Sequence, residues 1–126
     1  LYHVQRSVNL IIPHVTLGNG FDVSTVPVRK PPALCGFTLN ILCVADVTFW
    51  HGIDRLIHGI SQYKGDWNIQ LHIAGGGDEL PSKKQLASTL KLNDHIIFHC
   101  FVHGEDLDRL FEQNHIAVGS LGIHRI

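Results

Sequence analysis

The stretch from Asn40 to Ala74, NILCVADVTFWHGIDRLIHGISQYKGDWNIQLHIA, decides the fold because its hydrophobic period changes twice. Residues 40–45 form a short, continuous apolar run, which is typical of a strand buried on both faces of a parallel sheet. Residues 67–74 alternate between apolar and polar side chains, which predicts a second strand. Between them, four apolar residues recur at helical spacing and predict a helix over residues 51–63: Ile53, Leu56, Ile57 and Ile60.

The same alternation of strand and helix continues along the chain. Three glycines, residues 75–77, precede a helix for which Asp78 is the expected N-cap and Pro81 belongs to the first turn. Residues 95–102, rich in β-branched and aromatic side chains, predict a third strand, and residues 115–119 a fourth, with a helix between them. Strands separated by helices imply right-handed crossovers, so we predict an α/β fold. It is a Rossmann-like three-layer sandwich with a parallel sheet of about four strands.

Composition and charge narrow the class of protein. The chain has 126 residues, 44% hydrophobic and 17% charged, which favours one globular domain and excludes disorder. Residues 1–33 are expected to be a linker segment with one short edge strand at 8–12, and residues 34–126 the Rossmann-like domain. The formal net charge of −1 gives no overall attraction to nucleic acid. Three cysteines without CxxC spacing are expected to be buried thiols in a reducing compartment, which indicates the cytoplasm.

Ligands of open α/β sheets bind beyond the carboxyl ends of the strands. The loops at residues 45–51, 75–78 and 103–105 are expected at this edge, where helix N-termini can bind phosphate without net basic charge. Gly75 and Gly77 would let a phosphate or ribose approach the backbone; alternatively, they only form a tight strand-to-helix turn. Neither GxxxxGK[ST] nor GxGxxG after the first strand is present, which disfavours a P-loop NTPase and a standard dinucleotide site.

His51 and Arg55 are candidate phosphate ligands, because His51 precedes a helix and Arg55 follows one turn later. The alternative is that His51 caps the helix locally and Arg55 pairs with Asp54 or Asp108. A metal site is not expected. His95, His99 and His103 recur every four residues, but on a strand that interval spans about 13 Å, too far for one ion.

Five motifs in the right order resemble one family, and they cover nearly the whole chain from Gly18. They are residues 18–22 (GNGFD), residues 51–57 (HGIDRLI), residues 71–77 (LHIAGGG), the strand and loop at 96–103, and residues 107–119. Together they resemble the nucleotide-sugar-binding, C-terminal half of a GT-B glycosyltransferase of the family 4, or group 1, type. HGIDRLI resembles that family's Lys-Gly-x-x-x-Leu-Ile, and LHIAGGG its Ile-x-Gly-x-Gly turn.

The resemblance implies an enzyme that transfers a sugar from a nucleoside diphosphate sugar to an acceptor hydroxyl in polysaccharide or glycan biosynthesis. It implies retention of anomeric configuration, no cofactor and no essential metal. Donor contacts would fall at Gly52, Gly77 and His103, the last through its backbone. The glycan or lipid-linked acceptor would bind an N-terminal domain that this chain lacks, and a lipid-linked acceptor would add a peripheral position at the inner membrane face.

The chain also departs from the family pattern. The family's Glu-x7-Glu element would follow residue 126, so no catalytic residue is assigned and the fragment alone is expected to be inactive. Exposed apolar surface on the fragment is expected to favour self-association. The family usually has Gly-Arg after the first strand and Lys before the helix glycine, whereas this chain has Ala45-Asp46 and His51. Asp46 repels a diphosphate unless it points away or accepts a sugar hydroxyl. It therefore supports the alternative of a non-catalytic Rossmann-like interaction or regulatory module.

Overall fold

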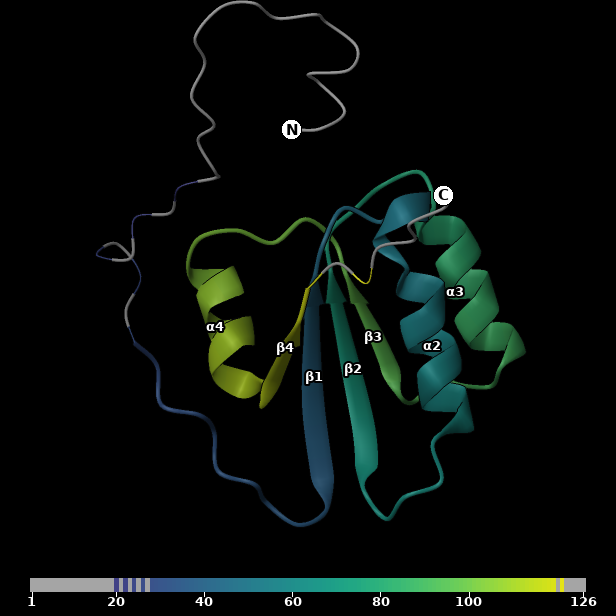
Figure 1. Cartoon of the computed structure of the whole chain (residues 1–126), viewed down its shortest axis with the longest axis horizontal. Helices are drawn as coiled ribbons and strands as arrows, with labels where there is room; N and C mark the ends of the chain where they lie inside the picture. The colour runs from purple at the N-terminus through teal and green to yellow at the C-terminus, as the bar shows by residue number, and fades with distance from the viewer. Residues whose placement is uncertain are drawn as a thin grey trace, which may run out of the picture.

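The computed structural model describes residues 20, 22, 24, 26, 28–119 and 121. The edge strand expected at residues 8–12 lies outside them. Four strands, β1 (Thr38–Val44), β2 (Asn68–Ala74), β3 (Ile96–His99) and β4 (Ile116–Val118), form one sheet in the order β3-β2-β1-β4. All three pairings are parallel, and Figure 1 shows the four strands side by side.

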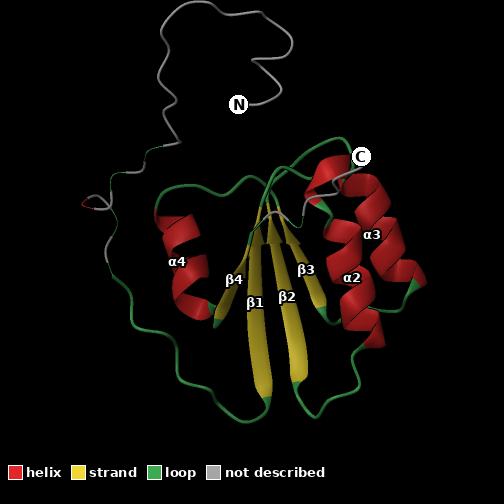
Figure 2. Cartoon of the chain, in the orientation of Figure 1, coloured by secondary structure: helices red, strands yellow, loops and turns green. Residues whose placement is uncertain are grey.

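Helices cover both faces of the sheet, which confirms the predicted three-layer α/β fold. A short 3-10 turn, η2 (Phe49–His51), leads into α2 (Ile53–Gln62), and α3 (Leu80–Thr89) follows β2. The last helix, α4 (Glu105–Gln113), connects β3 to β4. Figure 2 shows α2 and α3 on one side of the sheet and α4 on the other. The chain thus crosses from one face to the other after β3.

Alternate side chains of β1 and β2 build the two cores, as the strand period requires. Cys43, Leu71 and Ile73 pack with Ile57 and other buried residues of the α2 and α3 side. On the opposite face, Leu42 and Ala74 pack against Leu110 of α4. The continuous apolar run of the first strand therefore serves both faces, as the sequence predicted.

Several predicted boundaries were wrong by a few residues. The helix expected from His51 begins at Ile53, because Gly52 adopts a left-handed conformation, φ 69°, between η2 and α2. The third strand ends at His99 rather than at Val102. Asp78 does not cap α3. Glu79 occupies the N-cap position of this helix, and its side chain makes no capping hydrogen bond.

The cysteines only partly follow expectation. All three are free, and Cys43 is buried on β1. Cys35 and Cys100 are exposed, which contradicts the expectation of buried thiols. Cys100 is exposed because β3 ends one residue before it and the chain turns out of the sheet. Cys35 precedes β1 in the segment that leads into the sheet.

The segment before β1 is attached to α4 by Arg29. Its guanidinium forms an ion pair with Asp108 and lies 6.0 Å from the centre of the Phe111 ring. Glu112 lies 3.7 Å from Arg29 Nε. Asp108 therefore pairs with Arg29, so it is not the carboxylate that the alternative reading of Arg55 required.

Two histidines stack on the α4 side of β2 and β3. The rings of His72 and His99 are 5.3 Å apart and inclined by 13°, with His72 Nδ1 3.0 Å from His99 Nε2. Burial, and then the neighbouring His99, lowers the pKa of His72 below its usual value. The folded protein therefore binds this proton less readily than the unfolded chain does.

The fold should consequently lose stability in acid. This contribution is fully present above the usual histidine pKa and is lost as the pH falls through that value toward the lowered pKa of His72. Urea unfolding at about pH 8 and about pH 5 should give a smaller acid loss in His72→Gln than in the parent. His58→Gln, a change at an exposed histidine of α2, should keep the parent's loss. An equal loss in His72→Gln and the parent would contradict this expectation.

Candidate functional site

Two loops at the carboxyl edge of the sheet are joined by backbone hydrogen bonds. The N–H of Val47, after β1, donates to the carbonyl of Gly76 at 2.7 Å, and the N–H of Glu79 donates to the carbonyl of Val47 at 3.0 Å. These bonds connect the loop that leads into α2 with the loop that leads into α3. The two loops therefore form one continuous surface above β1 and β2.

The glycines of the second loop permit this close contact. Gly75 has φ +139° and Gly77 has φ +148°, and a Cβ at Gly75 would overlap with the carbonyl oxygen of Ala45. A Cβ at Gly77 would lie 2.6 Å from the carbonyl oxygen of Val47. The tight-turn alternative thus has a direct physical basis. Within the described residues, the N–H groups of Gly77 and Asp78 donate to no other residue, so they are open to a ligand.

A cleft of about 280 Å³ opens beside these loops. The residues that line it come from the ends of β1 and β2 and from the loop after β3: Val44, Ala45, Asp46, Ala74, Gly75, Phe101 and Val102. Phe101 is 74% exposed, and its ring lies against Gly76, where a Cβ would be 2.7 Å from the ring. Asp46 provides the only charged side chain among these lining residues. The cleft thus combines an aromatic face, a carboxylate and nearby backbone N–H groups.

His51 makes a local contact but does not cap α2 as its alternative reading predicted, since the N-cap of α2 is Gly52 and no side chain caps this helix. Its Nδ1 lies 2.6 Å from the hydroxyl of Thr48, and its backbone N–H donates to the Thr48 carbonyl at 3.2 Å. The ring is half-buried beside Trp50 at the carboxyl edge. Since Thr48 holds Nδ1, the other ring nitrogen, Nε2, is without a hydrogen-bond partner among the described residues.

The start of α2 is covered on one side by Leu121. The N–H of Leu121 donates to the His51 carbonyl at 3.0 Å, and a Cβ at Gly52 would lie 3.0 Å from the Leu121 carbonyl oxygen. Gly52 is accordingly buried. A phosphate at this helix must therefore approach from the side of His51 rather than from the side of Leu121.

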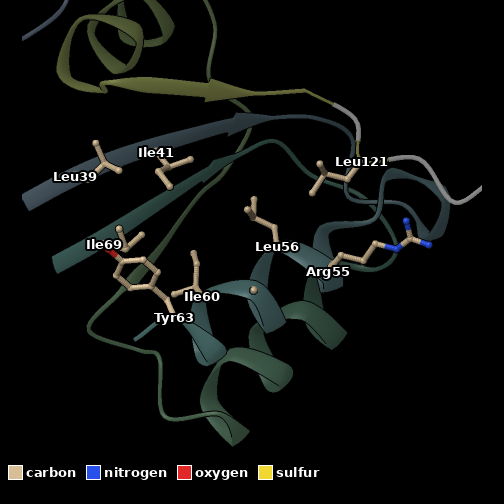
Figure 3. A pocket seen from close by; sticks show the side chains of 9 residues that line it. Leu39, Ile41, Arg55, Leu56, Ile60, Tyr63, Ile69 and Leu121 are labelled. Atoms are coloured by element: carbon tan, nitrogen blue, oxygen red, sulfur yellow. The ribbon is translucent and has the colours of Figure 1, made fainter. Parts of the chain in front are cut away.

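Arg55 belongs to a different hollow. It lines an apolar groove of about 440 Å³ between α2 and the sheet, together with Leu39, Ile41, Leu56, Gly59, Ile60, Tyr63, Ile69 and Leu121. Figure 3 shows its guanidinium extending away from the apolar side chains of this groove. Arg55 forms no ion pair with another described residue, so the alternative pairing with Asp54 or Asp108 is not observed. The structure does not bring Arg55 into the cleft.

Of the three remaining predicted positions, only one lines the cleft. Gly75 lines it, whereas Gly77 and His103 do not, and His103 is exposed in the loop before α4. Phe101 was missed because it was predicted to belong to the third strand. An apolar residue close to Gly104 was the signal that could have placed it in a loop.

One cationic side chain of α3, Lys83, is already paired. Lys83 is nearly buried, and its Nζ lies 2.9 Å from Glu79 Oε2. The hydrogen bond from Lys83, followed by that from Ser82, lowers the pKa of the Glu79 carboxyl. The Lys83 ammonium therefore stabilises the first turn of α3 and is not a free phosphate ligand.

Two kinds of feature are absent from the part of the chain that the structure describes. Within it, no three His, Cys, Asp or Glu side chains gather in a way that could hold a metal ion. None of the helices described is both long enough and apolar enough to cross a bilayer.

Comparisons with known proteins give one consistent answer. The model of the family described as glycosyl transferases group 1 matches residues 38–121. An uncharacterised glycosyltransferase of Methanocaldococcus jannaschii is 31% identical over 78 residues, which cover 62% of this chain and 20% of that protein. The apo form of the lipopolysaccharide outer core galactosyltransferase WaaB shares the fold, with a TM-score of 0.59 and 20% identity over 69% of this chain. The chain spans about a quarter of that structure.

Proposed function

Since this chain belongs to the group 1 glycosyltransferases, we propose that it is the part of a retaining enzyme that binds the nucleoside diphosphate sugar donor. The donor's sugar goes to an acceptor hydroxyl of a glycan in polysaccharide or glycan biosynthesis. Other parts of the enzyme bind the acceptor hydroxyl that receives the sugar, because the chain spans only about a fifth to a quarter of the relatives that it matches. The enzyme works in the cytoplasm. If its acceptor is lipid-linked, it works at the inner face of the membrane.

The cleft at the carboxyl edge is the proposed donor site. Open α/β sheets bind ligands at this edge, and the ring of Phe101 offers a flat surface for a nucleobase. The observation that carries the proposal is the pair of N–H groups at Gly77 and Asp78, which have no partner among the described residues and belong to the same loop as Gly75, a lining residue of the cleft. Backbone N–H groups stabilise a diphosphate without cationic side chains.

His51 is proposed to donate from Nε2 to the diphosphate. Thr48 fixes the ring through Nδ1, so the second nitrogen is held in one orientation at the same edge of the sheet. A hydrogen bond to a charged group contributes roughly 1 kcal/mol or more, which corresponds to about a fivefold change in affinity. The family's lysine would provide more, since it is always charged near neutral pH.

We expect His51→Ala to weaken nucleoside diphosphate binding about fivefold. Isothermal titration with UDP, GDP and ADP measures the affinity, and EDTA should leave it unchanged. His58→Ala, an exposed histidine of α2 outside the cleft, is the matched control and should bind like the parent. If the folded chain binds none of the three nucleotides, the donor-site proposal fails.

The alternative is a non-catalytic interaction module, and one observation favours it. Asp46 lines the cleft and repels a diphosphate, where a typical family member has a cationic side chain. Under this alternative, a protein partner binds the chain and remains bound after combined His51→Ala and Arg55→Ala changes. Loss of nucleotide binding without loss of a partner would favour the module, and the reverse result would favour the enzyme.

A further inference from the structure

A second polar pocket lies at the opposite edge of the sheet. It has a volume of about 440 Å³ and is formed by the end of α2, the loop that leads into β2 and the loop that leads into β3. β2 begins at Asn68 and ends at Ala74, so this pocket and the donor cleft are separated by roughly the length of a seven-residue strand, about 20 Å. A ligand in this pocket does not overlap the donor.

Two aromatic rings, Trp67 and Tyr63, form part of the wall. The Trp67 indole packs edge-to-face against Phe37, with ring centres 5.8 Å apart and planes inclined by 69°. Tyr63 is 42% exposed, and its hydroxyl lies directly over Gly65, where any Cβ would overlap it. Two large aromatic side chains therefore border the pocket, each in contact with a neighbouring residue.

Polar groups complete the pocket. Asp66 and Asn68 are exposed, and their side chains form no hydrogen bond or ion pair with another described residue. His95 is half-buried; its Nδ1 donates to the Ile69 carbonyl at 3.1 Å, which leaves Nε2 for a ligand. A carboxylate, an amide and an imidazole together both donate and accept hydrogen bonds.

This combination selects the chemistry of the ligand. Asp66 is the only charged side chain among the residues that line the pocket, so phosphates and other anions are disfavoured. The mainly polar wall does not suit a lipid. A pyranose has an apolar C–H face that packs on aromatic rings and a rim of hydroxyls that both donate and accept.

We propose that this pocket binds a pyranose unit of a glycan, held by Trp67 and Tyr63 and hydrogen-bonded by Asp66 and Asn68. The pyranose is a distal unit of the acceptor chain rather than the sugar being transferred, because the pocket lies a strand length from the donor cleft. That assignment to the acceptor rests on the proposed glycosyltransferase function, whereas the saccharide chemistry rests on the pocket alone.

The two tryptophans allow one experiment to separate the two sites. The chain contains only Trp50, on η2 at the donor edge, and Trp67 in the second pocket. Their indole N–H signals in ¹H–¹⁵N NMR can be assigned with Trp50→Phe. Titration with methyl β-D-glucopyranoside, methyl α-D-mannopyranoside and N-acetyl-D-glucosamine should shift the Trp67 signal saturably for at least one sugar. UDP, GDP or ADP should shift the Trp50 signal instead.

Matched variants test the hydrogen-bonding role. Asp66→Ala should weaken sugar binding about fivefold, because it removes a charged hydrogen-bond acceptor. Asp94→Ala changes an exposed carboxylate near the same edge that does not line the pocket, and it should bind sugar like the parent.

Three results would overturn the proposal. They are the absence of a Trp67 shift with all three sugars, equal affinity in Asp66→Ala and the parent, and a Trp67 signal that moves with protein concentration alone, which would assign the pocket to self-association. A failure of UDP, GDP and ADP to bind the folded chain would overturn only the donor-site proposal.

Discussion

Replacing Gly75 by alanine should lower the free energy of unfolding by about 3–5 kcal/mol, a large part of the stability of a domain of this size. The backbone at Gly75 has φ +139°, a region that residues with a Cβ rarely adopt. The added methyl would also overlap with the Ala45 carbonyl oxygen, which is backbone and cannot rotate away. Relief requires the loops after β1 and β2 to separate, which breaks the hydrogen bonds at Val47.

Gly59→Ala is the matched control for this experiment. Gly59 lies inside α2, is exposed, and has no atom within 4 Å of a Cβ built there. Alanine favours a helix interior over glycine by about 1 kcal/mol, so this variant should be more stable than the parent. Urea denaturation followed by circular dichroism measures both changes. A Gly75→Ala protein as stable as the parent would show that the loops are not packed as described.

The periodic segments explain why the fold could be predicted from the sequence. In β1 and β2, the side chains that face each core recur every second residue, and in α2 they recur every third or fourth. Such patterns are local, because each residue's burial follows from its position within its own element. The alternation of strands and helices along the chain then predicts a parallel sheet whose strands are connected by crossover helices.

The site was less predictable because its decisive contacts join distant segments. Leu121 covers Gly52, and Phe101 lies over Gly76, yet neither contact leaves a periodic pattern in the sequence. The third strand was predicted too long because β-branched and aromatic residues continue past His99, while the backbone already turns toward α4. His51 was placed correctly at the carboxyl edge, but its bond to Thr48 depends on a 3-10 turn that precedes Gly52.

Replacing Asp46 by arginine should strengthen nucleoside diphosphate binding about tenfold. Asp46 carries the only charge among the described residues that line the cleft, so the parent binds a polyanion against one repulsive charge. At about 4 Å, a pair of unit charges interacts by roughly 1 kcal/mol in water and up to about 4 kcal/mol near a protein surface. The change removes one repulsion and adds one attraction, each of roughly 1 kcal/mol even in water. Their sum exceeds the roughly 1.4 kcal/mol that a tenfold change in affinity requires. Asp46→Asn should give about a threefold gain, since it removes only the repulsion.

The same variants distinguish repulsion from a specific role of Asp46 in binding the donor sugar. Asp94→Arg makes an identical charge change near the opposite edge, beyond a Debye length of about 8 Å, and should alter affinity less than twofold. An uncharged nucleoside should bind Asp46→Arg and the parent equally, because the gain comes from charge. If Asp46 instead accepts a sugar hydroxyl, both Asp46 variants should bind a nucleoside diphosphate sugar more weakly while still binding the bare diphosphate more tightly. Weaker binding of the bare diphosphate would place the phosphates away from this cleft, because the only charge lining it could then not be acting on them.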